Sequence, residues 1–186
     1  MVSIQSLAAG LTALTESKLD STGVTMKSRF EHAWKFCTQE YDKGRILNES
    51  TLQAVLFREL SCGHDDLTVC EPKLLGGPAY EPDIVVAREG SIVAVCELKF
   101  FPHHYPPYED DLEKLRRYAT WSQLQALLLD PATGKYASNR FHFSEDCLLV
   151  FAVIGRWDSV ACSEPLAPQM QPHAERFFSL IHSVGG

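Results

Sequence analysis

The sequence predicts an α/β domain in which one sheet is covered by helices on both faces. From residue 48 to residue 155, hydrophobic periodicity gives the order helix, strand, strand, strand, helix, strand. One sheet layered between helices buries the apolar faces of elements in this order. The composition, 45% hydrophobic and 22% charged in 186 residues, is that of a globular chain long enough to bury a substantial core.

Two helices are expected before this core. Residues 3–19 are weakly amphipathic, and Gly23 follows them as a helix breaker. Residues 26–41 predict a second helix because apolar side chains recur along one stripe of it. That stripe consists of Phe30, Ala33, Trp34 and Cys37. Both helices are expected to pack onto the core as an N-terminal decoration.

The core begins with a helix inside residues 46–63, "ILNESTLQAVLFRELSCG". Its inward stripe follows the helical spacing of three and four residues. The stripe consists of Leu52, Val55, Leu56, Glu59 and Leu60. Asn48 or Ser50 can cap the start of this helix, and Gly63 can end it.

Three strands are expected next. Residues 65–72 predict a short strand, and residues 73–81 predict a turn region. Residues 82–88 and 91–101 are β-branched, apolar runs that predict a hairpin. The following segment, residues 102–108 with the sequence "PHHYPPY", predicts a loop because its prolines exclude regular structure.

The rest of the chain predicts two further helices and one strand. Residues 109–129 predict a long helix whose first turn is acidic, as the helix dipole favours. Residues 147–155 are apolar without alternation, which predicts a strand buried on both faces. A last helix is expected to start near Pro172. The expected parts, packed as one domain, are the N-terminal helical decoration at 1–47, the core at 48–155, and a C-terminal loop and helix at 156–186.

Charge and cysteine content limit the function. A net charge of −7 argues against a protein held on nucleic acid by bulk positive charge, although it leaves room for a local basic groove. No apolar run approaches the roughly 18 residues of a membrane span, and the N-terminus lacks the basic segment of a signal peptide. The six cysteines are scattered without a C-x-x-C pair, which favours reduced thiols, a cytoplasmic location and no zinc site.

The predicted hairpin carries three charges, Asp83, Glu97 and Lys99, that are costly in buried strands unless they are paired or bind a metal. Strand alternation puts Glu97 and Lys99 on one face, with Leu98 on the other. A three-residue turn at 89–91 pairs Asp83 with Glu97 and brings all three charges to that face. A strict two-residue turn would direct Asp83 to the opposite face.

Two neighbouring carboxylates repel each other, so one of them normally takes a proton unless a cation lies between them. Hard oxygen ligands in this arrangement favour Mg²⁺ or Mn²⁺. Beside such a cation, the Lys99 ammonium could hold an attacking water or neutralise a phosphoryl oxygen, as phosphodiester hydrolysis requires. The alternative interpretation is a surface salt bridge in which Lys99 pairs with Glu97 or Asp83.

The "PD" at 82–83 and the "ELK" at 97–99, on neighbouring predicted strands, resemble the signature of the PD-(D/E)xK nuclease superfamily. That resemblance implies the restriction-endonuclease-like fold, an αβββαβ core with a mixed sheet flanked by helices. The helix sequence "NESTLQAVLFREL" is similar to the first core helix of many members, and "DLEKL" at 111–115 to the start of their second. The resemblance covers residues 48 to about 155 and identifies no subfamily.

The resemblance implies roles for the matching residues of the hairpin. Asp83 and Glu97 would bind Mg²⁺ or Mn²⁺, with the Leu98 carbonyl as a further ligand. Lys99 would position or activate a metal-bound water for in-line attack on the phosphorus.

The first core helix is expected to supply a further acid. Glu49 is the preferred candidate, reaching the metal through water or helping to bind a second ion, and Glu59 is its competitor. Helix capping is the alternative role for Glu49. Gln53, four residues after Glu49, either touches the site or is solvated.

Four residues are candidates for contacts with nucleic acid, namely Gln53 and three residues outside the metal site. Lys114 and Arg117 share a helix face, which either meets a phosphate backbone or is solvated with Lys–Glu pairs. His103 lies in the loop directly after the Lys99 strand, where contact with nucleic acid and a rigid loop both remain open.

The sequence therefore predicts a Mg²⁺-dependent nuclease that hydrolyses phosphodiester bonds, with DNA as the expected substrate. The alternative is a catalytically inactive module of the same fold that binds nucleic acid or a protein partner. By analogy with small nucleases of this fold, a second copy or a partner protein is expected where both strands are cut.

Overall fold

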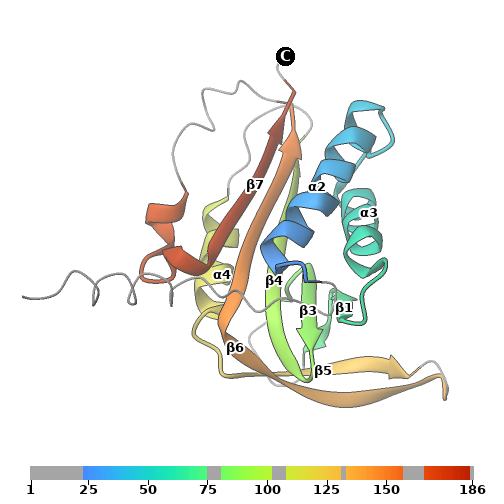
Figure 1. The fold of residues 1–186 in the computed structure, drawn as a ribbon, viewed down its shortest axis with the longest axis vertical. Coiled ribbons are helices and arrows are strands. Elements are labelled where there is room, and N and C mark those ends of the chain that lie inside the picture. The colour runs from blue at the N-terminus through green and yellow to red at the C-terminus, as the bar shows by residue number, and fades with distance from the viewer. Residues whose placement is uncertain (1–22, 75–80, 102–107, 131–132, 157–165, 185–186) are drawn as a thin grey trace, which may run out of the picture.

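The computed structural model of the chain describes residues 23–74, 81–101, 108–130, 133–156 and 166–184. These residues form an α/β fold in which helices cover both faces of a mixed sheet (Figure 1). The helices α2 (Met26–Asp42) and α3 (Glu49–Ser61) pack on one face, and α4 (Glu109–Tyr118) packs on the other. None of the helices described combines the length and the apolar character that crossing a bilayer requires.

The sheet follows the order β1-β3-β4-β6-β5-β2, and β7 lies beside β6. Its strands are β1 (Leu67–Cys70), β2 (Lys73–Leu74), β3 (Ile84–Arg88), β4 (Ser91–Phe101), β5 (Gln123–Asp130), β6 (Lys135–Gly155) and β7 (Phe177–Ser183). The hairpin strands β3 and β4 are antiparallel, whereas β4 and β6 are parallel and are joined across the α4 side of the sheet. Short 3-10 helices at Ala167–Met170 and Ala174–Arg176 precede β7.

Alternation along β3 and β4 divides the core into two clusters, one on each side of the sheet. The cluster beneath α2 and α3 includes Ile84, Val86, Ala94, Cys96 and Leu98. The cluster beneath α4 includes Val85, Val95, Leu112, Leu115 and Phe151. Glu97 and Lys99 share one face and Leu98 lies on the other, as the sequence predicted, and the structure shows that the shared face is the one on the α4 side.

The first two helices confirm the predicted periodicity. All residues of the predicted stripe of α2 are buried, and they are Phe30, Ala33, Trp34 and Cys37. In α3 the side chain of Asn48 accepts a hydrogen bond from the Thr51 amide at 2.8 Å, so Asn48 is the N-cap. Gly63 follows the end of α3 with a left-handed backbone (φ 74°), as expected after a helix C-terminus.

The hairpin confirms the predicted pairing at one end and corrects the predicted turn at the other. Ile84 pairs with Cys96, a register that places Asp83 opposite Glu97. The turn has two residues rather than three, because Arg88 pairs with Ser91. The two turn residues, at 89 and 90, both have positive φ, which suits a tight hairpin turn.

A β-bulge reconciles the short turn with the predicted face. Val86 pairs with Ala94, but the next residue, Ala87, pairs with Ile92, so Val93 is an extra residue on β4. One extra residue shifts the register by one, which reverses the facing of every residue beyond it. The bulge therefore allows a two-residue turn and still leaves Asp83 opposite Glu97.

The long helix predicted over residues 109–129 is wrong in its second half. The helix α4 ends at Tyr118, and β5 occupies Gln123–Asp130. Within β5 the buried residues Leu124 and Ala126 alternate with Gln123 and Gln125, and the strand pairs along its whole length with β6. Pairing with a long partner strand outweighs the helix preference of a leucine-rich segment.

The last helix predicted from Pro172 is also wrong, because Phe177–Ser183 forms β7 and pairs with Leu149–Gly155 of β6. The strand predicted at residues 147–155 is correct but starts earlier, at Lys135. The edge of β6 that does not face β4 offers backbone hydrogen bonds to β7, and this pairing favours a strand over a helix in that short apolar segment.

Several sequence predictions fall outside the described residues. They concern the helix at 3–19, most of the loop at 102–108 with His103, and Cys162. The described cysteines are free thiols, which agrees with the prediction of reduced thiols; they are Cys37, Cys62, Cys70, Cys96 and Cys147.

Candidate functional site

Asp83 lies directly before β3, at the point where β4 continues beyond its partner strand. One oxygen of Asp83, Oδ2, accepts a hydrogen bond from the Leu98 amide at 2.6 Å. The amide and the carbonyl of a strand residue point to the same neighbouring strand. The Leu98 carbonyl therefore faces the same edge as Asp83, where the sequence placed it as a ligand.

The helix α3 brings a second carboxylate to this edge. Glu49 Oε2 accepts a hydrogen bond from the Phe100 amide at 3.2 Å, two residues beyond Leu98 on β4. Gln53 donates to the Asp83 carbonyl at 3.0 Å. Glu59 instead pairs with its neighbour Arg58 at 2.8 Å. Of the two expected helix acids, the structure brings Glu49 next to Asp83, and Gln53 touches the site.

Glu97 is a fully buried carboxylate on the α4 side of the sheet, 0% exposed. Its two oxygens bind two side chains of α4. Lys114 Nζ lies 3.0 Å from Glu97 Oε2, and the Tyr118 hydroxyl donates to Glu97 Oε1 at 3.1 Å. Buried charges persist only with such partners, so α4 fixes Glu97 in place.

Lys99 reaches the same cluster through a different carboxylate. Its Nζ lies 3.4 Å from Oδ2 of Asp111, which is 2% exposed, and Lys114 Nζ lies 3.1 Å from Asp111 Oδ1. Asp111 thus links the two lysines, and Lys114 links Asp111 to Glu97. The surface salt bridge considered for Lys99 with Glu97 or Asp83 is not formed.

The sequence placed Lys114 on a face directed to nucleic acid or solvent, whereas the structure turns it inward to Glu97. Asp111 and Tyr118 were not expected in the site. The signal that identifies them is helical spacing, because Asp111, Lys114, Leu115 and Tyr118 are separated by three and four residues. Since Leu115 is buried against the sheet, its three polar neighbours on that stripe must face the sheet as well.

The cluster holds more negative than positive charge. Among the described residues, four carboxyl groups, Asp83, Glu97, Asp111 and Glu49, are coupled through contacts or charge to two ammonium groups, Lys99 and Lys114. Full ionisation would leave an excess of two negative charges in a largely buried place. A divalent cation is the charge that would neutralise this excess.

Two acids of the cluster, Glu97 and Asp83, have raised pKa values. Burial, followed by the charge of Asp83, raises the pKa of Glu97 from 4.5 to about 8. Burial also raises the pKa of Asp83 from 3.8 to about 6; the Leu98 amide opposes this rise and Glu49 adds to it. Burial lowers the pKa of Lys114, but Glu97 and Asp111 more than offset it, so Lys114 stays charged.

The donor set fits a hard divalent cation. Asp83 and Glu97 offer carboxylate oxygens, and the Leu98 carbonyl opens to the same edge, which is the ligand chemistry of Mg²⁺ and Mn²⁺. In the part of the chain that the structure describes, no three His, Cys, Asp or Glu side chains converge as ligands. Glu49 bonds a backbone amide, which suits contact with a cation through water more than direct ligation.

Arg117 differs from Lys114 although both lie on α4. Its Nε is 3.1 Å from Glu113 Oε1, and both side chains are about half exposed. This is the solvated Lys/Arg–Glu pairing considered as the alternative for this helix face. A contact between Arg117 and nucleic acid remains a prediction.

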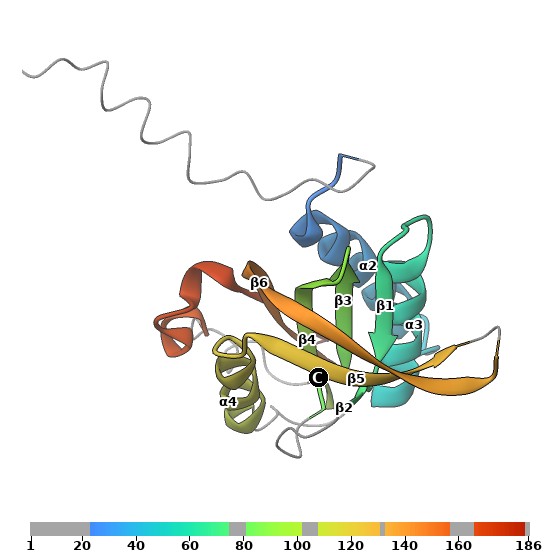
Figure 2. The same ribbon diagram turned by 90° about the horizontal axis from the view of Figure 1, so that it is seen from below.

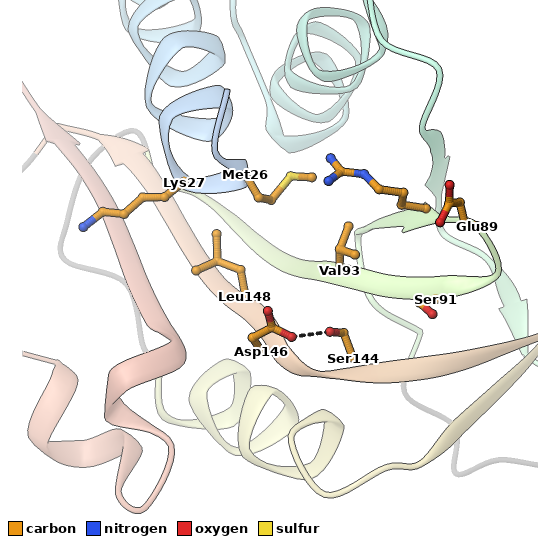
Figure 3. Close-up of a pocket in the computed structure, with 9 residues that line it drawn as sticks. Met26, Lys27, Glu89, Ser91, Val93, Ser144, Asp146 and Leu148 are labelled. Atoms are coloured by element: carbon orange, nitrogen blue, oxygen red, sulfur yellow. Dashed lines mark hydrogen bonds between the residues drawn. The ribbon is translucent and has the colours of Figure 1, made fainter. Parts of the chain in front are cut away.

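A separate cavity of about 230 Å³ lies at the other end of the hairpin (Figure 3). It is lined by the first residue of β4, Ser91, and by residues of α2 and β6, including Lys27 and Asp146. Figure 3 shows these charged side chains dispersed around the cavity, with Asp146 bonded to Ser144. None of the predicted site residues lines this cavity, so the cavity and the carboxylate cluster are distinct.

Comparison of the chain with protein-family models, curated proteins and solved structures finds no match. The α/β class, with its mixed sheet and flanking helices, follows from the structure itself.

The raised pKa of Glu97 predicts how the stability of the metal-free chain depends on pH. Between about pH 5 and pH 8 the folded state keeps a proton on Glu97 that the unfolded chain has lost, so the free energy of unfolding falls as pH rises. Glu97→Gln cannot ionise, so between about pH 5 and pH 8 its free energy of unfolding should decrease less than that of the wild type, by on the order of a few kcal/mol. Urea unfolding in EDTA at several pH values measures the free energy of unfolding of both proteins. An equal dependence on pH in wild type and Glu97→Gln would contradict the raised pKa of Glu97.

Lys114 should matter for stability far more than Arg117. Lys114→Met leaves the buried Glu97 carboxylate without its cation, and should lower the free energy of unfolding by about 2–3 kcal/mol above pH 8. Arg117→Met, the control on the same helix, breaks a half-exposed pair and should cost less than about 1 kcal/mol. Chemical denaturation of both variants tests this, and equal losses would show that Lys114 has no special partner.

Proposed function

We propose that this protein is a Mg²⁺- or Mn²⁺-dependent nuclease that hydrolyses phosphodiester bonds, with DNA as its expected substrate. The observation that carries the proposal is the convergence of Asp83 and Glu97, with an excess of negative charge, beside the ammonium of Lys99. Two acids and a lysine at the end of a hairpin are what metal-assisted hydrolysis of a phosphodiester requires.

The order of the elements supports the restriction-endonuclease-like fold as part of this proposal. The elements α3, β1, β3, β4, α4 and β6 follow the αβββαβ order, with β2 and β5 as additions. The antiparallel hairpin β3–β4 is followed by α4 and by β6, which is parallel to β4. This connection puts α4 over the face that carries Glu97 and Lys99.

Each residue of the site has a distinct task in the proposed reaction. Asp83, Glu97 and the Leu98 carbonyl would hold the cation, which when bound stabilises negative charge on the phosphoryl oxygens. Lys99 would orient the attacking water and neutralise the phosphate. Lys114 and Tyr118 would keep the Glu97 carboxylate in a fixed orientation, through the contacts that they make with it.

One observation favours the inactive binding module instead. Both Glu97 oxygens already have partners in Lys114 and Tyr118, so the cluster is partly satisfied without a metal. In a binding module this network would serve only to hold α4 on the sheet. The two candidates differ in whether Asp83 and Glu97 take up a divalent cation.

Cleavage of supercoiled plasmid in Mg²⁺ or Mn²⁺ tests the proposed reaction. Lys99→Ala should slow cleavage by about 100-fold or more, because it removes a positive group beside the developing charge, whereas Lys35→Ala, at an exposed position of α2, should cleave at nearly the wild-type rate. Equal rates for wild type and Lys99→Ala would end the proposal. Calorimetry of Mn²⁺ binding to the wild type and to Asp83→Asn separates the two candidates. If the wild type cleaves no plasmid and binds Mn²⁺ no better than Asp83→Asn does, the inactive module is the better description.

A further inference from the structure

A three-stranded surface projects from the fold at the far end of the sheet from α2. The strand β5 and the first part of β6, Lys135–His142, form an antiparallel hairpin that reaches past β3 and β1 (Figure 2). The short strand β2 joins this hairpin through the pairing of Lys73 with Leu127. The three strands form an extension that the αβββαβ order does not require.

The two faces of this extension differ in chemistry. One face is apolar and belongs to the core beneath α4, through Leu124, Ala126, Leu128 and Phe141. Residues paired directly across a sheet share a face, so the registers define the opposite surface, here called the outer face. The described side chains of this face are those of Lys73, Gln123, Gln125, Leu127, Tyr136, Ser138, Arg140 and His142.

The outer face is exposed and carries no carboxylate. The Tyr136 ring is 68% exposed, and Arg140 and Lys73 are exposed cations for which the described residues provide no acidic partner. Gln125 and Ser138 are joined across the strands by a hydrogen bond of 2.7 Å. In a chain with a net charge of −7, a surface with cations, amides and an exposed ring is a local exception.

The outer face comes near the candidate site at β2, whereas its residue His142 pairs with Ser91 at the other end of β4. The Glu71 amide donates to the Asp83 carbonyl at 3.0 Å, and β2 starts only two residues later, at Lys73. A polymer lying across β2 and β5 would therefore have one end directed to the strand that carries Asp83. A chain of phosphates with bases fits this combination, because cations and amide donors bind phosphates and an exposed ring stacks on a base.

We propose that the outer face of β2, β5 and β6 binds the phosphate backbone of the nucleic acid that is cleaved at the neighbouring site. This proposal rests on the proposed function, since it names the surface along which the substrate lies. Lys73 and Arg140 contact phosphates, and Tyr136 stacks on a base where the nucleic acid is single-stranded. A protein partner fits the outer face less well, because protein interfaces bury an apolar centre, whereas polar and charged residues outnumber aliphatic ones at these register positions.

Fluorescence anisotropy of a labelled oligonucleotide in EDTA tests the surface independently of cleavage. One arm uses single-stranded DNA, the other the corresponding duplex, each over a range of salt concentrations. Lys73→Glu/Arg140→Glu should weaken binding at least about tenfold. The slope of the logarithm of the binding constant against the logarithm of salt concentration should become shallower, by about 0.9 per lost phosphate contact on duplex and about 0.7 on a single strand. Tyr136→Ala should weaken single-strand binding by about fivefold or more and leave duplex binding nearly unchanged.

The matched control makes the same charge change elsewhere. Lys35→Glu/Lys43→Glu reverses two exposed cations outside the outer face, one within α2 and one at its C-cap, and should retain most of the wild-type affinity. The proposal is overturned if the wild type binds neither oligonucleotide, if the outer-face variant binds like the wild type, or if the α2 control loses as much affinity. A wild type that binds through the outer face but never cleaves would refute the nuclease and leave the surface assignment standing.

Discussion

The burial of the Glu97 carboxylate is the constraint on which the rest of the site depends. A carboxylate that is 0% exposed must either take up a proton or find positive and hydrogen-bonding partners. Lys114 and Tyr118 provide them from one face of α4. This requirement fixes the rotation of α4 about its axis, and it brings Asp111 and Lys99 into the same network.

The β3–β4 hairpin brings a second acid, Asp83, opposite Glu97. Its tight turn alone would direct Asp83 away from Glu97, and the bulge at Val93 reverses that direction. The result is a pair of acids at the end of β3 with Glu49 beside them. Burial is the main cause of the raised pKa values of both acids; the charge of Asp83 adds to the rise at Glu97, and the charge of Glu49 adds to the rise at Asp83.

Local patterns predicted those parts of the fold that neighbouring residues determine. The stripe of α2, the Asn48 cap and the apolar runs of the hairpin are signals of this kind. The segments Gln123–Asp130 and Phe177–Ser183 were misassigned because their strand form depends on pairing with β6, which no short window of sequence contains. The bulge and the inward direction of Lys114 depend likewise on distant partners. In the site, strand alternation was enough to predict that Glu97 and Lys99 share a face. The contacts that α4 makes with Glu97 depend on how the helix packs, and the sequence alone did not predict them.

The proposed nuclease requires that Asp83 and Glu97 jointly bind a divalent cation. The most direct measurement is a crystal soaked in Mn²⁺ and examined for anomalous scattering. We expect one strong peak bordered by Asp83, Glu97 and the Leu98 carbonyl, on the edge of β4 that faces Glu49. Anomalous peaks only elsewhere, or none at saturating Mn²⁺ while Lys114 remains bound to Glu97, would contradict it.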